Sequence, residues 1–316
     1  MTYKNKITAL SAVIAALAVI YILTIIFDPQ RRGSRSDLYS WIDPGQADRI
    51  TGIGITRDGE TLTLARNGGK WFVTRGGKDY PARLARVDDL ISALTKRDSY
   101  PVRSSSASSH ERLSLTPEKA SAQITVSAGA GPPLLDLLIG QADVMGRNVY
   151  LRRLDQNEAR SGEDRFSTYT NTAQNFWYNL RLFPENEDGK LGVQDVQKLI
   201  VYPPEKTSSQ TFTRKGREWA FSFELANPDF SKVESYIQDI LGVSGDDFID
   251  SVSASDPLFN AARIEMELGS GVTKTLRFGP PDENEKRYVT VSGSDLVYSV
   301  QGWSVRKMFV NTDTFK

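Results

Sequence analysis

The sequence of 316 residues contains no cysteine and only one histidine, His110. Without cysteine the chain can form no disulfide, no thiolate nucleophile, no cysteine-ligated metal site and no lipoprotein anchor. His110 follows a serine-rich stretch, so we expect it to be solvated in a polar loop over residues 103–121. An imidazole in a mobile loop has nothing to orient it, and no G-x-S-x-G motif is present, so a Ser/His/Asp triad is not expected.

Nucleotide-binding and metal-binding patterns are also missing. Gly52-Ile53-Gly54 and Gly129-Ala130-Gly131 open neither a G-x-G-x-x-G nor a G-K-[ST] motif, so we interpret these glycines as turn or bulge positions. The acidic clusters Asp246-Asp247 and Asp282–Glu285 are expected in solvated turns, because nothing sets oxygen-ligand geometry around them. The sequence therefore predicts no catalytic residue, no cofactor and no metal site.

The charges balance, with 39 basic and 39 acidic side chains. The first 35 residues hold five of the basic ones and one of the acidic ones, which leaves the remainder with a net charge of about −4. A basic surface of the kind that binds nucleic acid is therefore not expected.

One long hydrophobic run is present, and it stands at the N-terminus. Residues 7–27 are apolar or small and carry no charge, a length that matches the hydrocarbon core of a bilayer. We predict a transmembrane helix there, after a cytoplasmic N-terminus of residues 1–6. Ala16-Leu17-Ala18 has the form of a signal-peptide cleavage site, but the strongly apolar residues 19–27 beyond it favour an uncleaved anchor. The charges on the two sides of the run are nearly balanced and do not decide its orientation.

Several side chains in and after this run are candidate contacts. Small residues allow close approach of membrane helices, so one face of the run is expected to pack against a partner helix. Basic residues just after the run could contact anionic lipid headgroups. Trp41 stands in a predicted linker of residues 28–48 and is expected to contact a membrane interface or a partner. These candidates are Ala12, Ala15, Ala16, Ala18, Arg31, Arg32 and Trp41.

The remainder of the chain repeats itself. Arg66–Trp71 returns as Arg214–Trp219, both with the pattern R-x-G-x-x-W, and three further segments recur in the same order at separations of about 140 residues. We predict two tandem repeats, residues 49–183 and 193–316, joined by an acidic connector of residues 184–192. The pairs predicted to occupy equivalent structural positions are Gly68 and Gly216, Trp71 and Trp219, and Gly140 and Gly279.

Each repeat is predicted to be an α+β unit built on an antiparallel sheet. Strict alternation in Thr61–Leu64 is typical of a half-buried strand, and Asp58-Gly59 and Asn67-Gly68 are hairpin signals. Residues 81–96 have helical spacing of apolar residues and place Asp88-Asp89 on the exposed face. A second helix is predicted over residues 171–183. Doubly wound parallel topology is not expected, since no long βαβ alternation appears.

The tryptophans are the remaining candidates for recognition. Trp71 and Trp219 stand at equivalent positions, which favours a repeated packing role in each hairpin. Trp177 and Trp303 lie late in the two repeats and are also expected to pack. A sugar-stacking surface built from these rings has no support in their spacing.

Five features occur in a fixed order along the chain. They are an anchor, a hairpin ending in G-x-x-W, Tyr80-Pro81 at the start of a helical segment, the stretch 113–117 and the block Ile139-Gly140 to Leu151. In these features the chain resembles the bacterial domain-of-unknown-function family 4340, over about residue 50 to the C-terminus. Ser114 departs from the family pattern, which has a Tyr-Gly-Leu-like sequence there. The resemblance implies an envelope protein encoded beside ABC-transporter subunits and a gliding-motility-type auxiliary protein, and it carries over no catalytic residue.

Two hypotheses follow. The first is a non-catalytic accessory subunit of an ABC-type, gliding-motility-like transporter complex in the inner membrane, with a periplasmic head and with permease, ATPase and auxiliary subunits as partners. The alternative is a module that binds an envelope polymer such as peptidoglycan or polysaccharide. An enzyme is the least favoured class because no catalytic constellation is visible.

Overall fold

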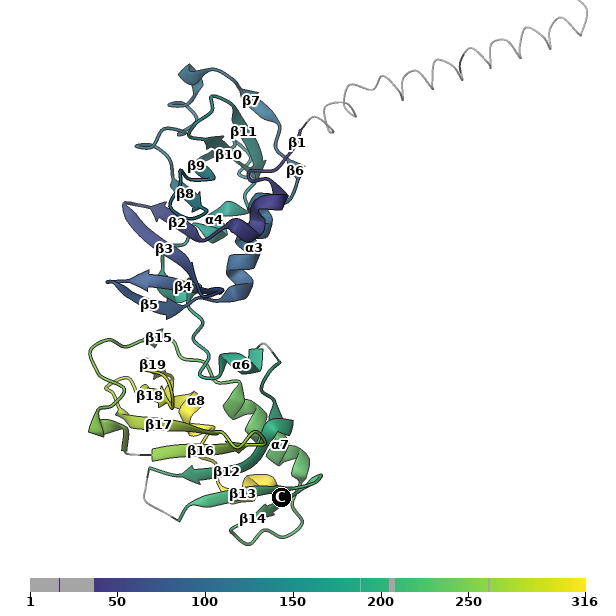
Figure 1. Cartoon of the computed structure of the whole chain (residues 1–316), viewed down its shortest axis with the longest axis vertical. Coiled ribbons are helices and arrows are strands. Elements are labelled where there is room, and N and C mark those ends of the chain that lie inside the picture. The colour runs from purple at the N-terminus through teal and green to yellow at the C-terminus, as the bar shows by residue number, and fades with distance from the viewer. Residues whose placement is uncertain (1–16, 18–36, 188, 205–207, 261) are drawn as a thin grey trace, which may run out of the picture. The chain divides into compact units, whose positions relative to one another are not determined.

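The computed structural model describes Leu17 and residues 37–187, 189–204, 208–260 and 262–316. They form two compact units: unit 1 comprises residues up to Asp79 and Leu84–Phe176, and unit 2 comprises Tyr80–Arg83 and Trp177–Lys316 (Figure 1). Among the described residues no helix is long and apolar enough to cross a bilayer. Apart from Leu17, the predicted membrane segment 7–27 lies outside the described residues, as do Ala12, Ala15, Ala16, Ala18, Arg31 and Arg32.

Unit 1 is built on a sheet of the order β5-β4-β3-β2-β8-β9-β10-β11-β7, in which the neighbouring strands from β4 to β7 are antiparallel. A separate short pair, β1 (Leu38–Tyr39) with β6 (Asp98–Ser99), lies where the chain enters the unit. The strands of the main sheet are β2 (Gly52–Arg57), β3 (Glu60–Asn67), β4 (Lys70–Arg75), β5 (Lys78–Pro81), β7 (Val102–Ser104), β8 (Ala122–Ser127), β9 (Leu135–Ala142), β10 (Asn148–Arg153) and β11 (Ala159–Glu163).

The first strands follow from alternation and from glycine turns. Ile53 and Ile55 of β2, like Leu62 and Leu64 of β3, are buried while their neighbours are not, as in a sheet with one covered face. The β3–β4 hairpin turns at Gly68-Gly69, both with positive φ, one residue later than the predicted Asn67-Gly68. Glycine adopts such a conformation without a steric cost.

The principal helix of unit 1, α3 (Leu84–Thr95), buries Val87, Leu90 and Leu94. It begins later than predicted, because Pro81 belongs to β5. Asp88-Asp89 lies on its exposed side, as its helical position requires. The shorter helices of the unit are η1 (Pro44–Arg49), η2 (Ala107–Ser109) and α4 (Phe166–Tyr169).

The predicted helix over residues 171–183 is wrong. Only one turn, α5 (Gln174–Trp177), is helical, and Tyr178 then forms an isolated bridge with Ala82. Trp177, Tyr178, Leu182 and Phe183 are nevertheless buried. Of the apolar residues at helical spacing, Trp177 and Phe183 are buried, whereas Phe176 and Leu180 are half-buried. The spacing therefore located a segment that contributes to the core, but tertiary packing uses irregular backbone there.

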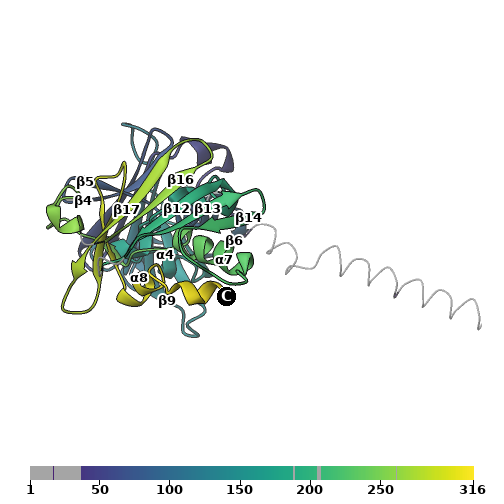
Figure 2. The ribbon, with the colours of Figure 1, turned by 90° about the horizontal axis from the view of Figure 1, so that it is seen from below.

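Unit 2 has a sheet of the order β14-β13-β12-β16-β17-β18-β19-β15, again antiparallel throughout. Its helix α7 (Phe230–Leu241) begins at Asp229, whose carboxylate accepts a hydrogen bond from the Ser231 N–H at 2.9 Å. Helices α7 and α8 lie along one side of strands β12, β13 and β16 (Figure 2). The other elements are α6 (Pro184–Glu187), η3 (Val193–Asp195), β12 (Val196–Tyr202), β13 (Gln210–Lys215), β14 (Glu218–Phe221), β15 (Asp247–Phe248), η4 (Pro257–Asn260), β16 (Ala262–Leu268), β17 (Thr273–Pro281), β18 (Arg287–Val291), β19 (Val297–Val300), α8 (Gly302–Arg306) and η5 (Thr312–Phe315).

The two sheets have matching connections. In each, an opening meander is followed by the principal helix, then by a short edge strand, and then by four strands that continue the sheet from the first strand of the meander. The meander has three strands in unit 2 and a fourth, β5, in unit 1, where β6 of the separate pair also comes before the edge strand β7. The fold class is therefore α+β with antiparallel sheets, as the sequence predicts, and strands make up most of the regular structure.

Candidate functional site

Trp71 and Trp219 are buried, with 6% and 3% of their surface exposed, as a packing role requires. They pair across the hairpins with Arg66 and Arg214, and the Arg214 guanidinium lies over the Trp219 ring at 4.4 Å. The recurring R-x-G-x-x-W pattern thus joins a cross-strand pair around a glycine turn.

Trp41 does not meet a membrane interface or a partner, contrary to the sequence-based expectation. Its side chain is 1% exposed and packs edge-on against Tyr39 and Tyr100. The main chain is fixed as well, because Ile42 N–H donates to the Leu94 carbonyl at 3.0 Å. The segment from Leu38 onward, predicted as linker, is therefore part of the folded first unit.

His110 is likewise not solvated. Only 8% of its surface is exposed, and its Nε2 lies 2.9 Å from the Asn157 carbonyl oxygen. The serines before it form the short helix η2, in which the Ser109 hydroxyl donates to the Ser106 carbonyl. Serine hydroxyls can satisfy backbone groups locally, and here they order a segment whose composition indicated a loop.

Gly140 and Gly279 are sites of close approach within their units. A Cβ at Gly140 would lie 2.3 Å from the Leu113 carbonyl oxygen, and a Cβ at Gly279 would lie 2.6 Å from Leu258 Cδ1. Each glycine therefore lets a segment outside the sheet lie directly on a central strand. In unit 1 this segment includes Ser114, which holds a positive φ of 56°.

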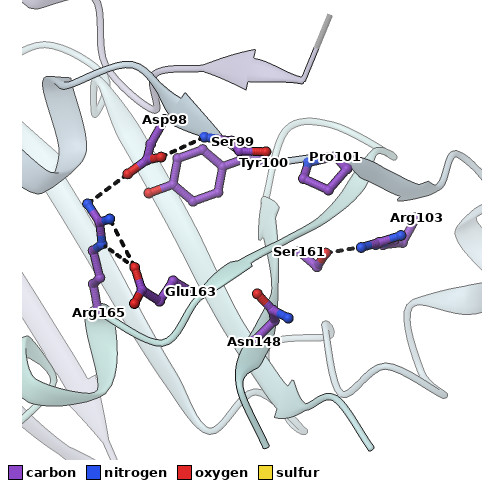
Figure 3. Close-up of a pocket in the computed structure, with 9 residues that line it drawn as sticks. All are labelled: Asp98, Ser99, Tyr100, Pro101, Arg103, Asn148, Ser161, Glu163 and Arg165. Atoms are coloured by element: carbon purple, nitrogen blue, oxygen red, sulfur yellow. Dashed lines mark hydrogen bonds and ion pairs between the residues drawn. The ribbon is translucent and has the colours of Figure 1, made fainter. Parts of the chain in front are cut away.

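Unit 1 contains a polar hollow of about 330 Å³ at the end of the sheet where β6, β10 and β11 meet (Figure 3). We call it the unit-1 hollow. None of the side chains that form it belongs to a sequence pattern that indicated a site. It is lined by Asp98, Ser99, Tyr100, Pro101, Arg103, Asn148, Ser161, Glu163 and Arg165.

Arg165 is the electrostatic centre of the unit-1 hollow. Its guanidinium lies 2.7 Å from Asp98 Oδ2 and 2.9 Å from Glu163 Oε2. The hydrogen bond to Glu163 raises the pKa of Arg165, and the charge of Asp98 acts in the same direction. One cation thus bridges two acids, and the three side chains position one another and together keep a net charge of −1.

The floor of the unit-1 hollow is formed by Tyr100. Burial raises the pKa of its phenol, so it is neutral at physiological pH. The ring lies directly on Gly162, where a Cβ would come within 2.4 Å of it. At the rim, Arg103 Nε donates to the Ser161 hydroxyl at 2.8 Å.

Unit 2 has a less polar hollow of about 370 Å³, which we call the unit-2 hollow. Trp303, predicted to pack, is instead 56% exposed at its edge, and the Lys307 ammonium lies 5.2 Å from the centre of its ring. Trp303 is in the short helix α8, which leaves the ring on the outside. The lining is Asp239, Ile240, Gly242, Val243, Ser244, Gly245, Asp246, Gln301, Trp303, Ser304, Lys307 and Met308.

Carboxylates that seemed candidates for metal binding have structural partners. Asp246 pairs with Lys286 at 3.1 Å, and Asp282 accepts hydrogen bonds from the N–H groups of Asn284 and Lys286 at 2.8 and 2.9 Å. Among the described residues no group of three or more His, Asp or Glu side chains is arranged to hold a metal ion.

The turn between β9 and β10 is a well-ordered structure. Asp143 Oδ1 accepts hydrogen bonds from the N–H groups of Met145 and Arg147 at 3.2 and 3.0 Å, and its Oδ2 accepts one from Asn148 Nδ2 at 2.8 Å. The Asn148 amide and these backbone N–H groups lower the pKa of Asp143. Gly146 supplies the positive φ that closes the turn.

This turn presents two apolar side chains to solvent. Val144 is fully exposed and Met145 is 74% exposed, the two highest values among the exposed large apolar side chains of the described residues. Sequence reasoning missed them, although an apolar pair between an aspartate and a glycine in a turn is itself a local signal.

The described chain thus consists of two α+β units with antiparallel sheets, each with a hollow of its own. The chain belongs to the family described as Domain of unknown function (DUF4340), whose model matches residues 71–258. This match extends from β4 of unit 1 to η4 of unit 2, and so agrees with the family resemblance seen in the sequence. Searches among curated proteins and among solved structures found no match.

Proposed function

We propose that the chain is a non-catalytic, membrane-anchored accessory subunit of an ABC-type, gliding-motility-like transporter complex, with its head on the periplasmic side of the inner membrane. The permease, the ATPase and an auxiliary protein are the expected partners, as the family resemblance implies. The anchor is the apolar stretch 7–27, whose length fits a bilayer.

The observation that carries this proposal is the exposed Trp303 beside the unit-2 hollow. Tryptophan is enriched at the centres of protein interfaces, and an exposed indole next to a concave surface is a suitable anchor point for a partner's apolar side chain. Ile240, Val243 and Met308 contribute apolar surface to the same hollow. In unit 1, by contrast, three of the four charged side chains of the hollow, Asp98, Glu163 and Arg165, are already paired with one another.

The head is further proposed to be a tandem duplication. The matching order of strands in the two sheets supports it. So does the recurrence of an aspartate that closes the same turn: Asp143 and Asp282 each accept hydrogen bonds from the N–H groups two and four residues later. Gly146 and Glu285, three residues after these aspartates, both have φ near +60°.

The test is affinity capture of the tagged full-length protein from native membranes in mild detergent, followed by mass spectrometry. Near-stoichiometric recovery of permease and ATPase subunits is expected from the wild type and from Val272→Ala, a control that truncates an equally exposed side chain of unit 2. Trp303→Ala should lose these subunits. Capture of the protein alone from wild-type membranes would refute the proposal.

The exposed indole also gives a specific reason to keep polymer binding as the second candidate. Sugars stack on aromatic rings, and Asp239, Gln301 and Ser304 provide polar groups around Trp303. The two candidate functions should respond differently to substitution of Trp303. Trp303→Phe preserves stacking on a sugar, whereas Trp303→Leu preserves only apolar contact with a protein. Retention by purified cell-wall material that survives Trp303→Phe and is lost in Trp303→Leu would favour the polymer.

A further inference from the structure

The exposed pair Val144-Met145 is held in place by a turn whose hydrogen bonds do not involve either side chain. Asp143 accepts from the backbone N–H groups of Met145 and Arg147, and the Gly146 N–H donates to the Asp143 carbonyl at 2.9 Å. The backbone is therefore fixed independently of what the tip carries. Two neighbouring apolar side chains in water at a fixed position lower solubility and offer contact surface.

The corresponding turn of unit 2 serves as an internal comparison. Asp282 accepts from the N–H groups of Asn284 and Lys286, and the Glu285 N–H donates to the Asp282 carbonyl at 3.1 Å. The two tip positions there are Glu283 and Asn284, both exposed. Because the same turn forms with polar tip residues, the apolar pair of unit 1 is not required by the fold.

The apolar turn projects from the end of unit 1 at which the chain enters it. Asn148, which ends the turn, pairs with Glu163 and lines the unit-1 hollow together with Ser99. Ser99 in turn pairs with Leu38, the first strand residue of the unit, which is 51% exposed. The turn and the entering strand thus both adjoin the unit-1 hollow.

The charged side chains at this end balance one another. Arg147 in the turn and Arg103 at the rim of the hollow are exposed cations. Arg165 offsets only one of the two carboxylates at the same end, Asp98 and Glu163, and Asp143 adds a third. The three arginines and the three carboxylates therefore sum to zero, so this end does not repel an anionic surface. Apolar tip residues flanked by arginine are the combination that binds at the boundary between lipid headgroups and acyl chains.

We propose that the turn 143–148 enters the lipid headgroup layer and holds unit 1 against the bilayer. This inference rests on the proposed membrane anchor. Residues 28–37 connect the apolar stretch to Leu38 and reach at most about 35 Å when fully extended, so the entry end of unit 1 must lie near the membrane surface. Val144 and Met145 contact the acyl boundary, while Arg147 pairs with lipid phosphates.

The absence of cysteine makes a direct test possible, because a single introduced cysteine is a unique attachment point for a fluorescent label. The full-length chain is reconstituted into vesicles of zwitterionic and anionic phospholipid, with labels at Val144→Cys, Glu283→Cys or Ala18→Cys. Insertion into the bilayer should blue-shift the emission of the label at position 144, and lipids that carry a quencher near the headgroup should diminish it. Position 283, on the matching polar turn, should stay unquenched.

Position 18 is near the middle of the apolar stretch 7–27, so its label is read with lipids that carry the quencher on the acyl chains, and it reports on the anchor alone. Quenching at 18 without quenching at 144 would overturn the inference and leave the anchor standing, whereas no quenching at 18 would refute the anchor and the inference together. A label at 144 that is shielded in native membranes but not in pure lipid vesicles would assign the turn to a protein partner, against the proposal.

A second variant tests the side chains themselves. Val144→Glu/Met145→Asn installs the polar pair that the turn of unit 2 already accommodates, so folding should be unaffected. A label at Gln141→Cys, exposed just before the turn, should be quenched in the parent and lose that quenching in the double variant. Equal quenching in both would contradict a role for the apolar pair.

Discussion

Gly140→Ala should destabilise unit 1 much more than Gly279→Ala destabilises unit 2. An added Cβ at position 140 would lie 2.3 Å from the Leu113 carbonyl oxygen and 3.1 Å from that of Ser114, both backbone atoms. At position 279 the nearest atom, at 2.6 Å, is Leu258 Cδ1, the far end of a side chain that can rotate away. The two glycines have the same predicted role, so each variant is the control for the other.

The magnitude follows from how firmly the segment over Gly140 is held. Leu113 N–H donates to the Ser109 carbonyl at 3.0 Å, and Arg152 Nε donates to the Leu115 carbonyl at 3.0 Å. Forcing this segment away costs about 1–3 kcal/mol of overpacking strain. Losing the hydrogen bond from Gln141 N–H to the Leu113 carbonyl adds about 1 kcal/mol. We therefore expect a loss of about 2–4 kcal/mol for Gly140→Ala and about 1 kcal/mol or less for Gly279→Ala.

Hydrogen exchange measured by mass spectrometry separates the two units, since peptides from β9 and β17 report on each. A loss of 2 kcal/mol or more corresponds to about 30-fold faster exchange through opening of β9. Gly279→Ala should change the β17 peptide by less than about 10-fold. Equal effects, or a larger effect at Gly279, would refute the close approach of Leu113 to Gly140.

Ser114→Gly should stabilise unit 1 by about 0.5–1 kcal/mol, because Ser114 holds a φ of 56°, which is unfavourable for a residue with a side chain. Urea denaturation would measure the change in the free energy of unfolding, and a destabilised variant would contradict this backbone conformation. Arg152→Met should lower the free energy of unfolding by about 2–4 kcal/mol in the same assay. The buried guanidinium donates to the carbonyls of Leu115 and Gln156 at 3.0 and 2.9 Å, and its removal leaves both carbonyls unsatisfied. The exposed Arg57→Met serves as the control and should change stability by less than about 0.5 kcal/mol. The pKa of Asp143 is lowered in the folded protein, so the stability it gives the turn is present above its ordinary value of 3.8 and is lost as pH falls through the lower folded value. Amide signals of Met145 and Arg147 in nuclear magnetic resonance spectra should therefore stay unchanged from pH 7 to about 4 and shift only in stronger acid. A shift centred above pH 4 would contradict the hydrogen bonds to that carboxylate.

Much of the sheet structure could be predicted from local patterns. Alternation in Thr61–Leu64 located β3, and the apolar spacing over residues 81–96 located α3. These signals are local, because a pleated strand or a helix with one covered face imposes its own period. They could not show that residues 171–183 would bury their apolar side chains without helical backbone.

Composition was misleading where long-range packing decided the outcome. Serine-rich and membrane-proximal segments usually belong to solvent, yet His110 and Trp41 are both buried in unit 1. Their partners, Asn157 and Tyr100, stand about 50 residues away in the chain. The residues next to His110 and Trp41 in the sequence do not indicate these contacts.

The two hollows could not be predicted from the sequence either, because the side chains that line each of them come from segments far apart in the chain. Asp98 meets Arg165 only because β6 and the end of β11 lie together in the folded unit. Trp303 is exposed because the short helix α8 places it on the outside, although its position late in the second repeat predicted that it would pack. The repeated aspartates were visible in the sequence, but their hydrogen bonds to the turn backbone distinguish a structural cap from a metal ligand.

The central claim is that this chain works by contacting the proteins of a membrane transporter, with Trp303 at the contact. The most direct measurement places a photo-crosslinking amino acid at position 303 of the full-length protein, irradiates native membranes and identifies the adduct by mass spectrometry. Our account predicts a crosslink to a permease or auxiliary polypeptide, which is absent when the same amino acid replaces Val272. A crosslink only to cell-wall polymer, or none at position 303, would contradict it.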